Sequence, residues 1–397
     1  MRDVYIVSAV RSPMGKYGGI LVDVSPVDLA AHAMKAAVER AGVDGGDLDF
    51  IVFGNILKHG HGQLLPRHAS IKAGIPKHVD SYSMDMLCSS AMMATMNGAM
   101  MIQTGQAEMV MTGGVESMSQ TGFLISHKAR YGLGLAAMAG PIAMKDVLIE
   151  EGLTDPMTGE AMGLQTDRLV DEYGITREEL DEVAYLSNKN AAAATENGDF
   201  AREIAPLEVM QRRQAVMLNK DDGIRPETTM DSLSKLRPAF RKEGKLTAAN
   251  SSQISDGSAA LILASEEAVK KHNLTPIGRF AGSAWSAGEP WRFVEATVPA
   301  IQKLAKQIGK SVEEIDLFEN NEAFALNNVL LRKVLGIPYE KINIYGGAIA
   351  LGHPIGCSGA RVIVTLLNAL QAQGGKYGIA SLCHGTGGAT AVAVERL

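Results

Sequence analysis

Short apolar runs alternate along the chain with segments of helical periodicity. Val4–Val10 and Phe50–Phe53 are apolar runs of the length that predicts buried strands. Between them, the Ser25-Pro26 pair is typical of a helix start and Gly42 of a helix end. Strands that alternate with helices in this way predict an α/β fold.

The alternation continues in the next part of the chain. The pattern predicts a helix over residues 89–104, closed by Gly105, and then a strand over residues 108–112. We expect this strand to end at Gly113 and Gly114, because paired glycines commonly interrupt regular structure.

The same arrangement recurs near the C-terminus. Ile315-Asp316-Leu317-Phe318 matches Leu48-Asp49-Phe50-Ile51, and Cys357-Ser358-Gly359-Ala360 matches Cys88-Ser89-Ser90-Ala91. In each copy the cysteine motif opens a predicted helix, and that helix leads to a strand followed by glycine. The common order and the nearly constant separation favour a duplication over chance.

Residues 118–250 interrupt the repeat with further helices, one of them opened by a capping box at Thr176 and Glu179. We therefore predict an N-terminal domain of residues 1–117 and 251–274, an inserted loop domain of residues 118–250, and a C-terminal domain of residues 275–397. Within the insertion, residues 202–245 hold 10 basic and 7 acidic side chains. A solvated surface of mixed charge and a patch for an anionic ligand are both consistent with this balance.

Composition narrows the class of protein. The chain has 397 residues, of which 46% are hydrophobic and 21% are charged, with a mean hydropathy of +0.03. No apolar run approaches the roughly 18 residues of a membrane helix, and no cleavage site follows the first apolar run. We expect a soluble, cytoplasmic protein. Its net charge of −6 gives no general attraction to nucleic acid or to anionic membranes.

Three cysteines lie far apart and form no CxxC pair, which argues against a zinc site or a disulfide framework. No metal site is predicted. Cys88 is expected at a helix N-terminus, where free N–H groups stabilise a thiolate and so favour a nucleophile. An inert buried thiol is the alternative for any single cysteine. We interpret Cys357 in this way, as a packing residue.

Three further elements place polar groups at predicted strand ends and loops. Asn321-Glu322 follows an apolar strand, and His353 ends a loop of small residues that lets the backbone approach a ligand. Cys383-His384-Gly385 ends another strand with a thiol and with backbone N–H groups that could hold an oxyanion. Each element taken alone is more often structural. Together they predict a catalytic site with two thiols and a histidine.

With these motifs, the whole chain resembles the thiolase family. The resemblance implies the thiolase fold, in which two α/β domains with mixed sheets are related by a pseudo-twofold axis and a loop domain is inserted in the first. It also implies a homodimer or homotetramer. The motifs that carry it, in the family's order, are Cys88-Ser89-Ser90, Gly113-Gly114-Val115-Glu116-Ser117-Met118-Ser119, Asn321-Glu322-Ala323-Phe324, Gly352-His353-Pro354 and Cys383-His384-Gly385.

The resemblance also implies a role for each motif. Cys88 would become acylated, His353 would activate it, and Cys383 would move the α-proton of the substrate. Asn321 would hold a water that completes a first oxyanion hole with His353. The backbone N–H groups of Cys88 and Gly385 would form a second hole.

Substrate-binding positions follow from the same resemblance. Arg225 would lie near the adenine of coenzyme A and Ser252 near its pantetheine, although Arg225 also fits a plain surface arginine. Met162 and Gly163 would belong to the loop that limits acyl-chain length.

Three positions depart from the family pattern. Asp85 stands where the family usually has Asn, and Ala91 where it usually has Gly. Ala161 replaces a histidine that short-chain biosynthetic thiolases present to the acyl-CoA, which leaves the substrate length open.

The implied activity is that of an acetyl-CoA C-acetyltransferase (acetoacetyl-CoA thiolase), which transfers acyl groups by a ping-pong reaction and a reversible Claisen condensation. Coenzyme A and acetyl-CoA would be substrates, and no cofactor would be bound permanently. A 3-ketoacyl-CoA thiolase of broader or longer chain length is an alternative. So is a non-catalytic acyl-CoA-binding protein of the same fold. Condensing enzymes that use one cysteine lack the counterpart of Cys383, and a thiol protease would need neither Cys383 nor a coenzyme A segment.

Overall fold

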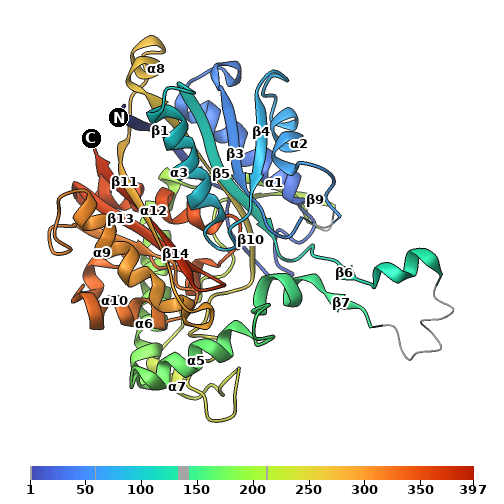
Figure 1. Ribbon diagram of the computed structural model, residues 1–397, viewed down its shortest axis with the longest axis vertical. Coiled ribbons are helices and arrows are strands. Elements are labelled where there is room, and N and C mark those ends of the chain that lie inside the picture. Colours follow the sequence, from blue (N-terminus) through green and yellow to red (C-terminus); the bar gives the residue numbers. More distant parts are fainter. Residues whose placement is uncertain (1, 59, 133–142, 212) are drawn as a thin grey trace.

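A mixed β-sheet runs through the molecule (Figure 1). The structure is a computed structural model that describes residues 2–58, 60–132, 143–211 and 213–397. Within these ranges the sheet contains β1 (Val4–Arg11), β2 (Gly15–Lys16), β3 (Phe50–Gly54), β4 (Asp80–Met84), β5 (Met109–Ser117), β10 (Ser255–Ser265), β11 (Gly278–Ala287), β12 (Leu317–Asn320), β13 (Tyr377–His384) and β14 (Gly388–Arg396).

The strand order is β12-β13-β14-β11-β1-β10-β5-β3-β4, and β2 pairs with the first residues of β10. The order contains twice a pattern of antiparallel neighbours followed by parallel ones. In the first half β1, β10 and β5 are antiparallel neighbours, whereas β5, β3 and β4 run parallel. In the second half β11, β14 and β13 are antiparallel neighbours, and β13 runs parallel to β12. The halves join where Tyr5 and Ile6 of β1 pair with Arg279 and Gly278 of β11. The duplication inferred from the sequence thus has a structural counterpart.

The aspartates of the repeated motif make equivalent contacts in the two halves. Asp49 accepts hydrogen bonds at 2.6 and 3.0 Å from the two backbone N–H groups at the start of β5. Asp316 accepts bonds at 2.7 and 2.8 Å from the corresponding N–H groups at the start of β13. Each carboxylate therefore ties one parallel strand to the next, where the ladder itself leaves N–H groups without partners.

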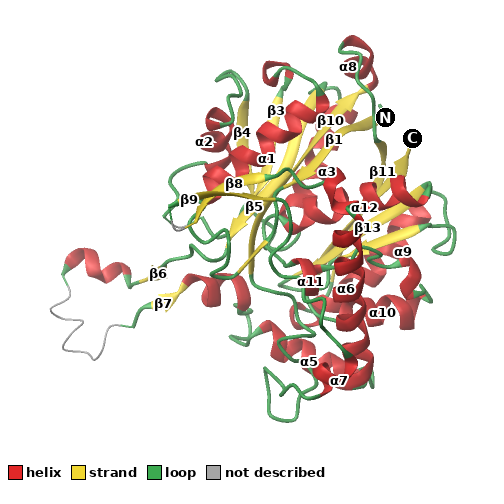
Figure 2. Cartoon of the chain, turned by 180° about the vertical axis from the view of Figure 1, so that it is seen from behind, coloured by secondary structure: helices red, strands yellow, loops and turns green. Residues whose placement is uncertain are grey.

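Helices lie on the outer face of each half of the sheet and also between the two halves (Figures 1 and 2). On the outer faces, α1 (Pro26–Ala41) and α2 (Leu65–Lys72) cover the first half, while α9 (Thr297–Gln307) covers the second and α10 (Leu326–Leu335) packs against α9. Between the halves, α3 (Ser90–Gln103) and α12 (Ser358–Gln373) pack against each other and against strands of both. Residues 358–370 of α12 are buried without interruption, as expected for a helix enclosed on all sides.

The segment between β5 and β10 lies over the end of the sheet where α3 and α12 begin (Figure 1). The predicted capping box is confirmed, since Thr176 and Glu179 each hydrogen-bond the other's backbone at the start of the long helix of this segment. Among the described residues, the other helices and strands are α5 (Met162–Glu172), α6 (Arg177–Asn197), α7 (Met230–Ser234), α8 (Glu266–Lys271), α11 (Ala348–Leu351), β6 (Phe123–Leu124), β7 (Lys145–Asp146), β8 (Leu207–Gln211) and β9 (Gln214–Leu218). There are also 3₁₀ turns at Gly45–Asp47, His127–Tyr131, Asp199–Arg202, Pro290–Ala296 and Tyr339–Lys341 and a π-helical turn at Leu148–Leu153.

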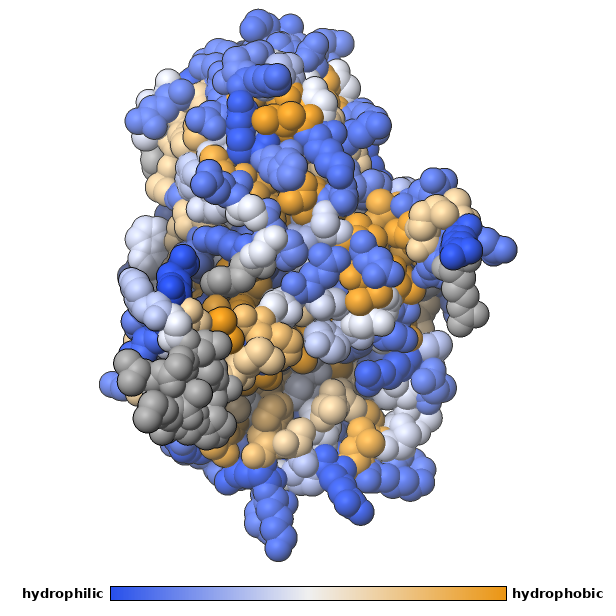
Figure 3. All heavy atoms as spheres, turned by 90° about the vertical axis from the view of Figure 1, so that its right-hand side faces the viewer, coloured by the Kyte–Doolittle hydropathy of each residue, from blue (hydrophilic) through white to orange (hydrophobic). Residues whose placement is uncertain are grey.

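An arm projects from the body of the molecule at β6 and β7 (Figures 1 and 2). Its apolar side chains are exposed, among them Phe123 at 62%, Tyr131 at 85% and Met144 at 66%. The side of the molecule from which the arm projects carries apolar patches between hydrophilic ones (Figure 3).

The domain boundaries predicted at residues 117, 250 and 274 stay a prediction. Among the described residues, no helix is both long enough and apolar enough to cross a membrane.

The strand predicted to stop at Gly113 and Gly114 continues through both glycines to Ser117, so that prediction was wrong. A Cβ atom on Gly113 would collide with the carbonyl oxygen of Ala259, and one on Gly114 with that of Gly356. At Gly114 the loop of Gly356 packs directly on the strand, so this glycine marks close packing between layers. At Gly113 the atoms in the way belong to the neighbouring strand β10 and to the ring of Phe53 on β3.

We predict that Gly114→Ala lowers the free energy of unfolding by about 1–3 kcal/mol, because a rigid backbone carbonyl cannot move aside for the new methyl group. Gly122→Ala is the control, since a Cβ atom there meets no other atom within 4 Å. Thermal and urea unfolding of the two variants measure the difference. Equal stability of both variants would contradict the packing argument.

Candidate active site

A cavity of about 590 Å³ opens where the inserted segment covers the ends of the sheet. The sequence-predicted residues that line it come from six separate stretches of the chain. They are Cys88, Met162 with Gly163, Arg225, Ser252, His353 and Cys383. The fold thus brings together both candidate catalytic thiols, the histidine and the positions expected to bind coenzyme A.

Cys88 lies on the tight turn between β4 and α3. Leu87, directly before it, has φ of 51°, a left-handed conformation that is costly for a residue with a side chain. Ser90 supports the turn, because its hydroxyl accepts from the N–H of Met86 at 2.8 Å and donates to the carbonyl of Leu87 at 2.6 Å. The turn places the Cys88 thiol in the wall of the cavity.

His353 faces the thiol of Cys88, with 3.3 Å between Nε2 and Sγ. On the other side of the ring, Nδ1 lies 2.6 Å from the hydroxyl oxygen of Ser358, and that hydroxyl donates its proton to the carbonyl of Pro354 at 2.9 Å. Ser358 can therefore only accept from the imidazole, so Nδ1 carries the ring proton. The unprotonated Nε2 is left to accept the proton of Cys88.

Burial keeps this pair neutral at rest. It raises the pKa of Cys88 well above the ordinary value, and the nearby thiol of Cys383 raises it further, while the N–H groups of Gly385 and of Cys88 itself act in the opposite direction. Burial, aided by the charge of Arg361, lowers the pKa of His353 to about 3. The expected position of Cys88 at a helix N-terminus is confirmed, since Ser89 is the N-cap of α3. The expectation that this position holds Cys88 as a thiolate was wrong, because desolvation dominates. A base is therefore needed, and His353 is in place.

Asn321 reaches the same imidazole from the loop after β12. Its amide nitrogen is 3.5 Å from Nε2 of His353, and its backbone N–H donates to the carbonyl of Ser381 at 2.9 Å. The amide oxygen of Asn321 is buried and has no partner among the described residues. This position suits an amide that binds a small polar group beside the histidine.

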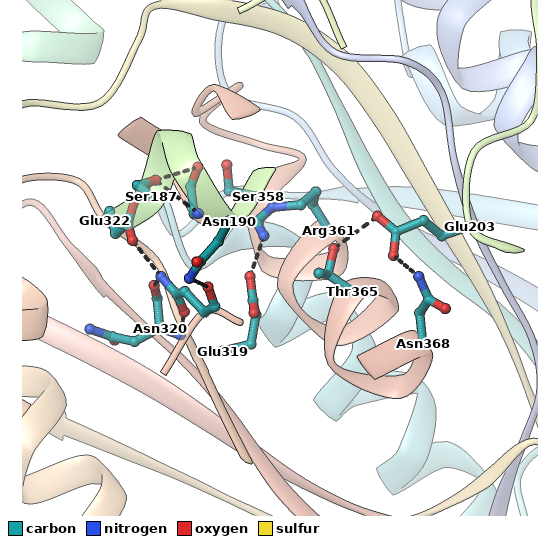
Figure 4. Close-up of polar contacts among 12 residues, drawn as sticks. Ser187, Asn190, Glu203, Glu319, Asn320, Glu322, Ser358, Arg361, Thr365 and Asn368 are labelled. Atoms are coloured by element: carbon teal, nitrogen blue, oxygen red, sulfur yellow. Dashed lines mark hydrogen bonds and ion pairs between the residues drawn. The ribbon is translucent and has the colours of Figure 1, made fainter. Parts of the chain in front are cut away.

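Glu322, next to Asn321, fixes that loop (Figure 4). Its carboxylate accepts from the hydroxyl of Ser187 at 2.7 Å, from the amides of Asn343 and Asn328 at 2.8 and 3.0 Å, and from the N–H of Ile349 at 3.1 Å. The carboxylate links the loop of Asn321 to α6 and to the first turn of α11, which leads to His353.

Cys383 ends β13, with its thiol in the cavity wall. Burial raises the pKa of Cys383 to about 11. Two partners of the catalytic groups were missed by sequence reasoning. Ser358 was noted only as part of the internal repeat, and Asn327, which donates to Sγ of Cys383 at 3.3 Å, carried no motif signal at all.

The remaining wall of the cavity comes from the inserted segment and the loop before β10. Met162 begins α5, and the next residue, Gly163, lies so close to the ring of Phe240 that a Cβ atom would overlap it. Phe240 packs edge-on against Phe324 at 6.0 Å between ring centres. Ser252 is held by its N–H, which donates to the carbonyl of Ala323 at 3.0 Å.

Comparison with protein families identifies both halves of the chain. The family model described as thiolase, N-terminal domain, matches residues 4–267, and the one described as thiolase, C-terminal domain, matches residues 274–396. The chain belongs to the thiolase family. It is an acyltransferase, and members of this family work through a thioester on a cysteine.

Individual relatives agree with this assignment. An acetyl-CoA acetyltransferase of Synechocystis is 53% identical over 100% of both chains. Among solved structures, the Bacillus anthracis acetyl-CoA acetyltransferase is 40% identical with a TM-score of 0.96, and human mitochondrial 3-ketoacyl-CoA thiolase is 38% identical with a TM-score of 0.96, each match covering 100% of this chain and 99% of the other. Acat5 thiolase from Ascaris suum in complex with coenzyme A is 35% identical, with a TM-score of 0.92 and full coverage of both chains. The predicted thiolase fold is confirmed.

Within this thiolase site, Cys357 takes no part in the cavity. It is fully buried at the position before α12 and does not line the cavity, as expected for a packing residue. Of the three positions that depart from the family pattern, Ala161 lines the cavity at the start of α5. Ala91 is fully buried, and Asp85 accepts a bond at 3.3 Å from the N–H of Leu87 in the nucleophile turn.

We predict that Ser358→Ala slows acylation of the enzyme by acetyl-CoA about 10–100-fold, because the imidazole loses the acceptor that holds its proton on Nδ1. Rapid-quench measurement of acyl-enzyme formation tests this. Cys357→Ala is the matched control, since it removes the neighbouring buried side chain without touching the ring. An equal loss in both variants would show that packing, and not the tautomer, controls the rate.

Proposed function

We propose that this thiolase is an acetyl-CoA C-acetyltransferase that interconverts two acetyl-CoA with acetoacetyl-CoA and coenzyme A. The observation that carries the proposal is the single cavity lined by a histidine-paired thiol and a second thiol. The names of the Synechocystis and Bacillus anthracis relatives support the short-chain substrate.

The first half-reaction acylates Cys88. As its sulfur attacks the thioester carbonyl, Nε2 of His353 takes the thiol proton, and the ring keeps its other proton on Nδ1 against Ser358. The N–H groups of Cys88 and Gly385, which already favour negative charge at this sulfur, would hold the tetrahedral oxyanion. Coenzyme A then leaves as its thiol with the proton from His353.

The second half-reaction forms the carbon–carbon bond. Cys383, as a thiolate, removes the α-proton of a second acetyl-CoA, and His353 with Asn321 would stabilise the enolate oxygen, the latter through a bound water. The α-carbon attacks the acyl carbon on Cys88, and the carbon–sulfur bond to Cys88 breaks. The α-proton taken up by Cys383 passes to the departing sulfur, which restores the Cys88 thiol and the Cys383 thiolate. Thiolysis is the reverse of these steps. No permanently bound cofactor takes part, since coenzyme A and acetyl-CoA enter as substrates.

Coenzyme A would lie along the cavity from the inserted segment to the thiols. Arg225, Ser252 and Met162 all line the cavity. Arg225 would bind the adenine end and Ser252 the pantetheine, while Met162 would close the acyl end. The Ascaris suum thiolase in complex with coenzyme A supports this class of ligand. Because the net charge is −6, the protein as a whole does not attract anionic coenzyme A, so basic groups close to the cavity would have to bind it.

We also propose a cytoplasmic homodimer or homotetramer. The exposed apolar side chains of the arm formed by β6 and β7, such as Phe123, Tyr131 and Met144, support assembly, because apolar groups on a projecting segment are typical of a surface that another chain covers.

A 3-ketoacyl-CoA thiolase of broader chain length is the second candidate. The similarity to human mitochondrial 3-ketoacyl-CoA thiolase favours it, as does Ala161, whose small side chain leaves room in the acyl end of the cavity. Thiolysis rates measured from acetoacetyl-CoA to 3-ketohexadecanoyl-CoA separate the two candidates.

We predict that Cys88 carries the acetyl group after incubation with acetyl-CoA, as read by peptide mass spectrometry. Cys383→Ala should still form this acyl-enzyme, but thiolysis and condensation should fall about 10²–10⁴-fold, because only these steps need α-proton transfer. Acetylation of Cys357, or unchanged thiolysis in Cys383→Ala, would refute the assigned roles.

We predict that the wild type accepts five- and six-carbon ketoacyl-CoA with a gradual decline from the four-carbon substrate, since one methylene in an apolar pocket changes binding by only roughly 1–3 kcal/mol. Ala161→His should steepen the decline, because the ring fills space beside Met162. The measurement is kcat/KM for the three chain lengths in both enzymes. The same profile in both would remove Ala161 from the control of specificity.

A further inference from the structure

Asn327 contacts the second thiol of the site from inside the protein. It lies in the first turn of α10 and is fully buried, as is Cys383 at the end of β13. Its amide nitrogen is 3.3 Å from Sγ of Cys383, within hydrogen-bond reach for sulfur. The cavity lies in front of this thiol, and Asn327 does not line it.

The orientation of the Asn327 amide is determined by its other two partners. The backbone N–H of Phe324 donates to Oδ1 at 3.0 Å, and the carbonyl of Val294 accepts from Nδ2 at 3.4 Å. A backbone N–H can only donate and a carbonyl can only accept, so the amide cannot be turned around. Its N–H end must therefore face the sulfur of Cys383.

This arrangement makes the sulfur of Cys383 an acceptor on its buried side. Its own S–H must then point away from Asn327, toward the cavity where the substrate's α-carbon would lie. A donated N–H also favours the thiolate over the thiol, so Asn327 lowers the pKa of Cys383 against the larger upward effect of burial. The hydrogen bond from Asn327 can therefore be kept in both the thiol and the thiolate form of Cys383, the two forms through which an acid/base group passes.

We propose that Asn327 is a positioning residue for Cys383, whose donated N–H directs the thiol proton into the cavity and stabilises the thiolate during α-proton transfer. This inference rests on the proposed role of Cys383. It adds a residue to the second half-reaction and leaves acylation of Cys88 untouched, because Asn327 contacts neither Cys88 nor His353 through any hydrogen bond of the described residues.

Two substitutions separate this role from simple support of the cavity wall. Asn327→Ala removes all three contacts. Asn327→Asp keeps an oxygen for the N–H of Phe324, and so keeps the loop anchored, but it replaces the donor to sulfur by a carboxyl oxygen. Val329→Ala, which trims a buried side chain on the same helix, controls for weakened packing of α10.

The first measurement determines the rate of each half-reaction separately. Both Asn327 variants should form the Cys88 acyl-enzyme from acetyl-CoA at the wild-type rate, while kcat for thiolysis of acetoacetyl-CoA falls about tenfold or more with little change in KM. Val329→Ala should keep the wild-type ratio of the two rates.

The second measurement follows the thiol itself. In a Cys88→Ala background, the pH dependence of alkylation of Cys383 by iodoacetamide, read by peptide mass spectrometry, reports its thiolate fraction. The midpoint should rise by about one unit in Asn327→Ala, equivalent to a tenfold smaller thiolate fraction at a given pH, and further in Asn327→Asp, where a negative charge faces the sulfur.

The proposal is overturned if Asn327→Asp restores wild-type thiolysis and the wild-type midpoint, because the amide would then only anchor Phe324. It is also overturned if neither variant shifts the midpoint. Cys383→Ala distinguishes this failure from a failure of the proposed function: thiolysis retained in Cys383→Ala removes the role of Cys383 itself, whereas an inactive Cys383→Ala beside fully active Asn327 variants removes Asn327 alone.

Discussion

The catalytic geometry depends on the close approach of two backbone segments at the centre of the molecule. The loop before α12 passes directly over β3 and β5, where Cβ atoms on Gly54 or Gly114 would collide with the carbonyl of Gly356. Deeper in, Gly359 lets α12 pack on α3 at Met92. Because Cys88 lies next to the N-cap of α3 and His353 lies in the loop before α12, this contact between the two central helices brings thiol and imidazole to 3.3 Å. A longer side chain at these glycines would separate them.

Buried carboxylates hold the same loops in place. Glu116 at the end of β5 accepts from the N–H of Gly356 at 2.9 Å and from the N–H groups of Ile56 and Leu57, so it joins the loop of His353 to the loop after β3. Burial raises the pKa of Glu116 to about 7. Full hydrogen bonding offsets much of the cost of such a group, and it restricts the loop to one conformation.

Arg361 and Glu319 form a second buried polar contact behind the histidine, at 2.6 Å (Figure 4). Arg361 lies one turn along α12 from Ser358, and its charge helps to keep His353 neutral. The interior thus has two functions in this enzyme. It raises the pKa of both thiols by burial, and it supplies fixed donors and acceptors that would direct each proton when a substrate arrives.

The sequence alone determined most elements, the internal repeat and the family, and it predicted the residues proposed to carry the chemistry. Strand and helix periodicity, caps and the motifs around Cys88, His353 and Cys383 are all local signals. The tertiary structure decided what depends on contacts between distant segments. Gly113 and Gly114 were read as a strand end, since a sequence does not show what packs on a glycine. The protonation of Cys88 was misjudged because desolvation depends on the whole surroundings, and Asn327 carried no local signal. Its contact with Cys383 exists only because α10 meets the end of β13, 56 positions away along the chain.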